Sequence, residues 1–81
     1  MWKEEDNRLK AGFEFKDFVT AFSFMTQVAI LAEKKNHHPF WSNVYNHVNV
    51  ELCTHDAGDI VTEKDWDLAK SIEIAYAQFV K

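Results

Sequence analysis

Few residues of this chain interrupt regular secondary structure. Its 81 residues include only two glycines and one proline, and 47% of them are hydrophobic. This is the composition of one compact globular domain rather than of a disordered segment, so we expect residues 1–81 to form a single domain. A chain of this length buries only about 60% of its unfolded surface. We therefore expect burial between subunits to supplement a small core.

Other absences exclude whole classes of partner. No apolar run is long enough to cross a bilayer, and the first residues, MWKEEDNR, are too polar for a signal peptide, so we expect a cytoplasmic protein without a membrane anchor. The net charge is −4 and the only adjacent basic residues are Lys34 and Lys35, which argues against direct nucleic-acid binding. The single cysteine, Cys53, cannot form an internal disulfide and is expected to be a packed or surface thiol.

Two apolar periods predict the first half of the fold. Apolar and polar residues alternate from Leu9 to Phe15, which predicts a strand with one buried face, and a turn before it leads back to a short strand around Trp2. From Asp17 the period becomes that of a helix with two adjacent apolar stripes, namely Phe18, Phe22, Met25, Ala29 and Ala32, and Ala21, Phe24, Val28 and Leu31. The stripes cover about half of the helix circumference. We therefore expect two neighbours for this helix and place Phe22 in the core.

The same two periods return in the second half. Apolar and polar residues alternate over 47–54, and residues 41–45 would be the partner strand of a second hairpin, with Asn46 near its turn. Thr62 and Asp65 have the spacing of a capping box at the start of a last helix, whose apolar stripe is Leu68, Ile72, Ala75 and Phe79. The order ββαββα predicts an α+β fold, a four-stranded antiparallel sheet with two helices packed on one face.

Three of the four histidines fall at element ends, where side chains can converge on a cleft: His37, His38 and His55. The imidazole, with an ordinary pKa of about 6.5, suits proton transfer near neutral pH. Neighbouring residues of an extended segment point to opposite sides, so we expect different tasks for His37 and His38. His55 would approach them if the last strand lies beside the start of the second hairpin.

Three separated blocks of the sequence match one known signature. They are Glu33-x-x-Asn36-His37-His38-Pro39-x-Trp41-x-x-Val44-Tyr45-Asn46, then Thr54-His55-Asp56, and then Thr62-Glu63-Lys64-Asp65. The blocks resemble the pterin-4a-carbinolamine dehydratases, and the similarity extends from Trp2 to Phe79. The resemblance implies homodimers or homotetramers of an α+β fold that dehydrate 4a-hydroxytetrahydropterin to quinonoid dihydropterin in pterin recycling. It also implies that no metal and no cofactor beyond the pterin substrate are needed.

The resemblance also implies the site residues. The catalytic residues would be His37, His38 and His55, and the substrate-binding residues would be Glu33, Asn36, Pro39, Trp41 and Asp65. Loss of the 4a hydroxyl group needs an acid for the oxygen and a base for the proton at N5, and each well-placed group contributes about 10²–10⁴ in rate. Three of these residues could instead have purely structural roles. Glu33 could be a solvated helix end, Trp41 a core residue, and Asp65 a helix cap, which is compatible with a place in the site.

Two other functions remain open at this stage. Three histidines and a glutamate could bind zinc, but adjacent histidines rarely bind one ion, and their spacing matches no helical or finger pattern. The second alternative is a protein-interaction module without a physiological dehydratase role. Animal members of the family that this sequence resembles also serve as dimerisation cofactors of a homeodomain transcription factor, and the broad apolar arc of the first helix would suit a partner helix.

Overall fold

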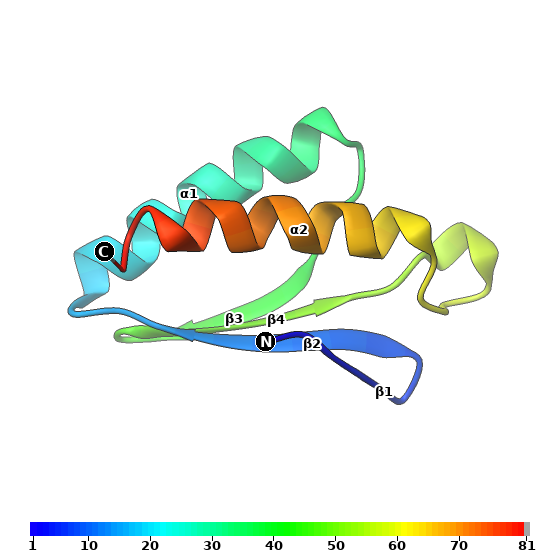
Figure 1. The fold of residues 1–81 in the computed structure, drawn as a ribbon, viewed down its shortest axis with the longest axis horizontal. Helices are drawn as coiled ribbons and strands as arrows, with labels where there is room; N and C mark the ends of the chain where they lie inside the picture. The colour runs from blue at the N-terminus through cyan, green and yellow to red at the C-terminus, as the bar shows by residue number, and fades with distance from the viewer. Residues whose placement is uncertain (81) are drawn as a thin grey trace.

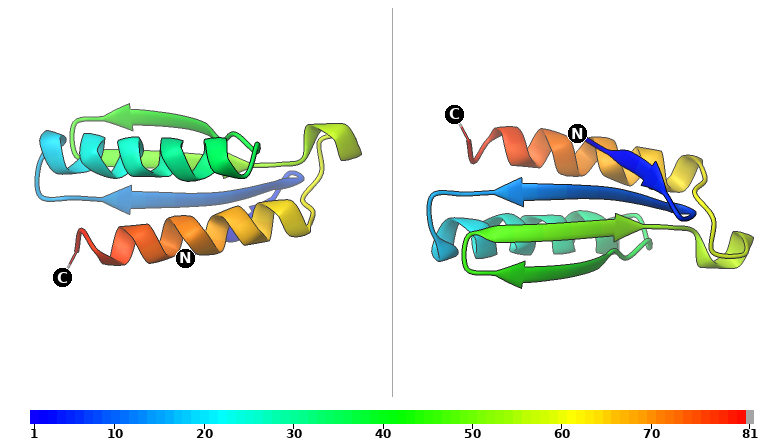
Figure 2. Two further views of the ribbon diagram at one scale, coloured as in Figure 1. Left: turned by 90° about the horizontal axis from the view of Figure 1, so that it is seen from above. Right: turned by 90° about the horizontal axis from the view of Figure 1, so that it is seen from below.

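The computed structural model describes residues 1–80 and contains four strands, two α-helices and one short 3₁₀-helix. In chain order they are β1 (Lys3–Glu5), β2 (Arg8–Glu14), α1 (Phe18–Lys34), β3 (Phe40–Val44), β4 (His47–Leu52), the 3₁₀-helix η1 (His55–Ala57) and α2 (Glu63–Ala77). The strands form one antiparallel sheet in the order β1-β2-β4-β3. Both helices cover the same face of this sheet (Figure 1) and leave the other face open (Figure 2). The predicted α+β fold is confirmed.

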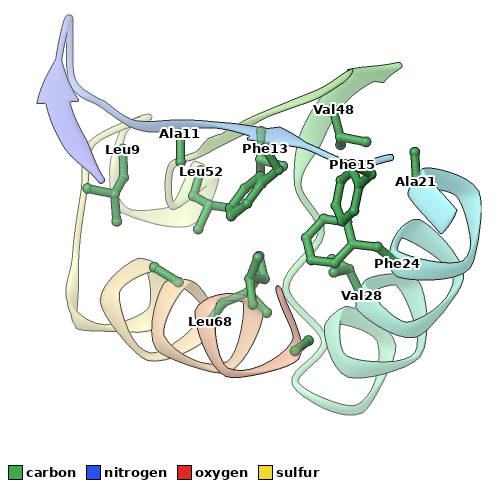
Figure 3. Packing of buried hydrophobic residues seen from close by; sticks show 14 residues of the cluster. Leu9, Ala11, Phe13, Phe15, Ala21, Phe24, Val28, Val48, Leu52 and Leu68 are labelled. Carbon is green, nitrogen blue, oxygen red and sulfur yellow. The ribbon is translucent and has the colours of Figure 1, made fainter. Parts of the chain in front are cut away.

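The central strand pair supplies the floor of the core. In the register of β2 and β4, Leu9 lies opposite Leu52 and Phe13 lies opposite Val48, so the apolar positions of both strands face the helices together. Figure 3 shows how these side chains meet those of the helices. We expected the first strand around Trp2, and in the structure it begins one residue later, at Lys3. The ring of Trp2 packs edge-on against Phe13 with a centroid distance of 5.8 Å.

Helix α1 begins and ends as its sequence predicts. The Asp17 carboxylate accepts a hydrogen bond from the Thr20 backbone N–H at 2.8 Å and caps the helix. The Thr20 side chain and this backbone bond lower the pKa of Asp17. Beyond the helix, Asn36 takes the left-handed conformation with φ of 50°. That conformation turns the chain away from the helix axis and toward β3.

The buried residues of α1 come mainly from one of its two apolar stripes. Ala21, Phe24 and Val28 belong to the stripe that begins at Ala21, and Ala32 belongs to the stripe that begins at Phe18. Our placement of Phe22 in the core is wrong, because this side chain is 55% exposed and shares the outer face of the helix with Phe18, Val19 and Ile30. The sheet and α2 lie on one side of α1 (Figure 2). Phe18 and Phe22 of the other stripe stay exposed among the described residues.

Helix α2 carries the predicted capping box. The hydroxyl group of Thr62 accepts from the Lys64 backbone N–H, and the carboxylate of Asp65 accepts from the Thr62 backbone N–H at 2.8 Å. The apolar stripe packs against the sheet through Leu68, Ile72 and Ala75, whereas Phe79 lies beyond the last helical residue and packs against the core from there. Neither helix of residues 1–80 combines the length and the apolar character that crossing a bilayer requires.

Candidate active site

A cleft of about 250 Å³ lies where four elements of the fold end or begin. The end of α1, the end of β4, η1 and the first turn of α2 contribute its lining residues, which are Asn36, His37, His38, Cys53, Thr54, His55, Asp56 and Lys64. The sheet register explains this meeting. Phe40, the first residue of β3, pairs with Glu51 near the end of β4. The segment before β3 and the segment after β4 therefore lie at the same end of the strands. All three predicted histidines therefore line one cleft.

His37 is the most enclosed of the three histidines. Its side chain is 11% exposed, and its Nε2 atom lies 2.5 Å from Oδ1 of Asp65, whose own side chain has no exposed surface. The backbone N–H of His37 donates to the carbonyl oxygen of Ala32 at 3.0 Å, which fixes the residue to the end of α1. A carboxylate at one ring nitrogen favours a proton on that nitrogen. In neutral His37 the other nitrogen, Nδ1, then carries the lone pair.

Asp65 is a buried carboxylate with hydrogen-bond donors on both oxygens. Its Oδ2 atom accepts from the Thr54 hydroxyl group and from the Thr62 backbone N–H, each at 2.8 Å. The hydroxyl oxygens of Thr54 and Thr62 lie 2.6 Å apart. These donors stabilise a charge that would otherwise be costly to bury. The structure thus places Asp65 behind His37, and it reaches the cleft only through that ring.

Sequence reasoning missed Thr54 as a site residue. It follows Val48, Val50 and Leu52 in the alternation that marks the buried face of β4, and its side chain is buried. A hydroxyl group at a core-facing position needs a hydrogen-bond partner. A threonine at a position where the alternation predicts a buried apolar residue was the signal in the sequence that could have identified Thr54.

His38 has a different partner from His37. Its Nε2 atom lies 2.9 Å from Oε1 of Glu33, and both side chains are exposed. An exposed pair of this kind contributes little to stability. Glu33 itself is absent from the cleft lining and would reach a ligand through His38.

His55 stands in the open at the start of η1. Its side chain is 88% exposed, and Nδ1 lies 2.8 Å from Oδ1 of Asp59. The hydrogen bond to Asp59, the charge of Asp59 and the charge of Asp56 together raise the pKa of His55. Gly58 and Asp59 both have positive φ, 95° and 59°, and this turn brings the carboxylate of Asp59 back to the ring. His55 is therefore protonated to a higher pH than an ordinary histidine.

The remaining predicted site residues have different surroundings. Asn36 lines the cleft, whereas Pro39 and Trp41 do not. Trp41 is half-buried, lies opposite Val50 in the sheet and packs against the hydrophobic core. Within residues 1–80, no three side chains of histidine, cysteine, aspartate or glutamate are grouped so that they could hold a metal ion. The chemistry available in the cleft is proton transfer by imidazoles of unlike surroundings.

The sequence and the fold match known proteins. The family model for pterin 4 alpha carbinolamine dehydratase matches residues 1–75. A candidate pterin-4-alpha-carbinolamine dehydratase of Synechococcus sp. strain WH7803 is 56% identical over 72 residues, which are 89% of this chain and 76% of that protein. A second candidate, from Rhizobium johnstonii, is 59% identical over 68 residues, which are 84% of this chain and 66% of that protein. The chain thus spans 66–76% of the length of these two relatives.

Solved structures agree with the sequence match. A Brucella melitensis protein described as a transcriptional coactivator/pterin dehydratase superposes with a TM-score of 0.88 at 44% identity, over 93% of this chain and 81% of that chain. A pterin dehydratase-like protein described as a RuBisCO assembly factor in the alpha-carboxysome superposes with a TM-score of 0.76 over 94% of this chain and 87% of that chain. At 19% identity the latter likeness concerns the fold alone. On the strength of the match over residues 1–75, the chain belongs to the pterin-4a-carbinolamine dehydratase family.

Proposed function

We propose that this protein dehydrates 4a-hydroxytetrahydropterin to quinonoid dihydropterin and water. The observation that carries the proposal is the unlike surroundings of the histidines in one cleft. His37 is bound to a buried carboxylate, and His55 has a raised pKa beside an exposed one. A pair of titratable groups with different surroundings is what an acid/base reaction near neutral pH needs.

The reaction divides into two proton transfers. Protonated His55 gives a proton to the 4a hydroxyl group, and the C4a–O bond breaks so that its electron pair leaves with the oxygen as water. Neutral His37 accepts the N5 proton, and the electrons of the N5–H bond form the C4a=N5 double bond. His38, held by Glu33, positions the pterin ring, with Asn36 in the cleft wall and Pro39 and Trp41 supporting the segment that carries the histidines. No oxidant or metal takes part in this balance.

The test is a dehydratase assay on freshly generated 4a-hydroxytetrahydropterin. Because this compound also loses water spontaneously, the quantity to compare is the rate in excess of a protein-free control. We expect a clear excess that survives treatment of the protein with a chelator. An excess rate that disappears with the chelator and returns with zinc would reassign the site to metal chemistry. If no excess rate is found at any protein concentration, the protein-interaction module is the better assignment of function.

The pH dependence of the reaction tests the role of His55. In Asp59→Asn the ring loses both the hydrogen bond to a carboxylate and its charge, so the pKa of His55 falls. The acid form is then lost at lower pH, and the alkaline limb of kcat/KM is expected to move to lower pH than in the wild type. Asparagine tolerates the left-handed backbone of residue 59, so the turn is retained. An unmoved alkaline limb would remove His55 as the acid, and Asp56→Asn serves as the milder control.

The outer face of α1 supports a proposed assembly into homodimers or homotetramers. Residues 18–32 contain no charged side chain, and Phe18, Val19, Phe22 and Ile30 are exposed along the helix. An uncharged apolar face of this kind marks an interaction surface. We expect sedimentation at micromolar concentration to show dimers or tetramers, and Phe22→Glu to shift the population toward monomers. A monomeric wild type at that concentration would contradict the assembly.

The physiological setting that we propose is pterin recycling in the cytoplasm. Substrate of this kind arises where an aromatic amino acid hydroxylase oxidises a tetrahydropterin, so a neighbouring hydroxylase gene would support the assignment. The competing role, a protein-binding module, would use the same outer face of α1. Loss of partner binding in Phe22→Glu with an unchanged dehydration rate per subunit would separate the two roles.

A further inference from the structure

The hydroxyl group of Thr54 is buried, fully hydrogen-bonded and one residue from a proposed catalytic histidine, yet the proposed reaction does not use it. We infer that Thr54 is a positioning residue for His37. Through Asp65, it fixes which ring nitrogen of His37 carries the proton. The catalytic consequence of this inference rests on the proposed function, whereas its structural consequence, the tautomer of His37, can be measured without any activity.

The direction of each hydrogen bond in the network follows from the groups involved. An ionised carboxylate can only accept, so Thr54 donates its single hydroxyl proton to Oδ2 of Asp65, at 2.8 Å. The contact of 2.6 Å between the two hydroxyl oxygens then requires Thr62 to donate to Thr54. Thr62 in turn accepts from the Lys64 backbone N–H. The chain of donors runs one way, from the first turn of α2 through two hydroxyl groups to the carboxylate.

The other oxygen of Asp65 is left for His37. Because Oδ2 already accepts from Thr54 and from the Thr62 backbone N–H, the carboxylate is held with Oδ1 toward Nε2 of His37. This oxygen also only accepts, so Nε2 of His37 carries a proton. In the neutral ring the lone pair is then on Nδ1, for which the described residues provide no hydrogen-bond partner. A neutral ring with its lone pair on Nδ1 is a form that can accept the N5 proton.

The substitution Asp65→Asn is expected to move the ring proton of His37 to the other nitrogen. The Thr62 backbone N–H lies at Oδ2 and can only donate, so the side-chain amide of Asp65→Asn must place its oxygen there and its NH₂ group toward His37. Nε2 of His37 would then accept, and the ring proton would move to Nδ1. The substitution keeps the size of the side chain and inverts the tautomer. We expect kcat to fall by about 10²-fold or more, because the proton now occupies the basic nitrogen.

The test for Thr54 compares Thr54→Val with Thr54→Ser. Valine keeps the shape of threonine but removes the hydroxyl donor, so it loosens the carboxylate, whereas serine retains the donor. Nitrogen-15 NMR of labelled protein reads the tautomer of His37 directly. We expect the Nε2–H form in the wild type and in Thr54→Ser, and the Nδ1–H form in Asp65→Asn. In Thr54→Val the carboxylate is held only by the Thr62 backbone N–H and can turn away from Nε2, so we expect a fraction of the Nδ1–H form beside the Nε2–H form. The kcat of Thr54→Val is expected to fall about 10-fold at an unchanged KM.

Matched controls separate positioning from general damage. Thr26→Val removes an exposed hydroxyl group that donates to the Phe22 carbonyl oxygen within α1 and does not line the cleft. Its kcat and its His37 tautomer are expected to equal those of the wild type. A folded Thr54→Val protein with the wild-type tautomer and kcat would overturn the inference. Inverted tautomers in a protein without any dehydratase activity would support the network and reject the proposed reaction, so the two failures are distinguishable.

Discussion

His37→Ala should lower kcat and destabilise the protein together. Loss of the base is expected to reduce kcat by about 10-fold or more, with partial activity left because the acid remains. The same substitution removes the partner of Asp65 Oδ1 and leaves part of a buried carboxylate unsatisfied. That loss costs about 1–3 kcal/mol. Steady-state kinetics and chemical denaturation of the same preparation measure both effects.

The other two histidines serve as controls for this double effect. His55→Ala is expected to lower kcat by about 10-fold or more, since it removes the acid, but to leave stability nearly unchanged because the side chain is exposed. His38→Ala is expected chiefly to raise KM. Wild-type kinetics in all three variants would contradict the proposed role of these histidines in catalysis. All three histidines are partly exposed, but His37 is exposed by only 11% and contacts the buried Asp65 carboxylate, so a stability cost is expected for His37 alone.

Phe24→Ala is expected to cost about 3–5 kcal/mol of the free energy of unfolding. Its ring has no exposed surface and lies 5.1 Å from Phe13, 4.9 Å from Phe15 and 5.9 Å from Tyr76, measured between ring centroids. The cavity left by alanine would sit where both helices meet the sheet (Figure 3). Denaturant unfolding monitored by circular dichroism gives the difference from the wild type.

Phe22→Ala is the matched control on the same helix. It removes the same atoms from a side chain that is 55% exposed. The expected cost is about 0.5 kcal/mol or less, measured at a protein concentration low enough to keep subunits apart. Equal costs for the two variants would mean that the outer stripe is as buried as the inner one, which would contradict the packing of α1 on the sheet.

The sequence predicted the order of the elements because each element's period is local. Alternation from Leu9 and the helical period from Asp17 each need only a few neighbouring residues to be recognised. The choice between the two stripes of α1 is not local. Both Phe22 and Phe24 are apolar at helical spacing, and only the position of the sheet and of α2 decides which one is covered.

The same division applies to the cleft. Residue type and position at element ends were enough to predict that His37, His38 and His55 could converge, and they do line one cleft. The burial of Asp65 could not be predicted, since it depends on a contact with His37 28 residues earlier and on a bond from Thr54 11 residues earlier. The capping box was predictable because it joins residues three apart.

The sheet order has a consequence for how the chain acquires its structure. The central pair joins β2 from the first ββα half to β4 from the second, so neither half contains a complete sheet or a complete core. Each half alone would expose the apolar side of one central strand. We therefore expect the two halves to fold in one cooperative transition, and we expect the amide protons of β2 and β4 to exchange with solvent only when the whole molecule unfolds. Because the His37–Asp65 contact joins the two halves, the cleft exists only when both halves are folded together.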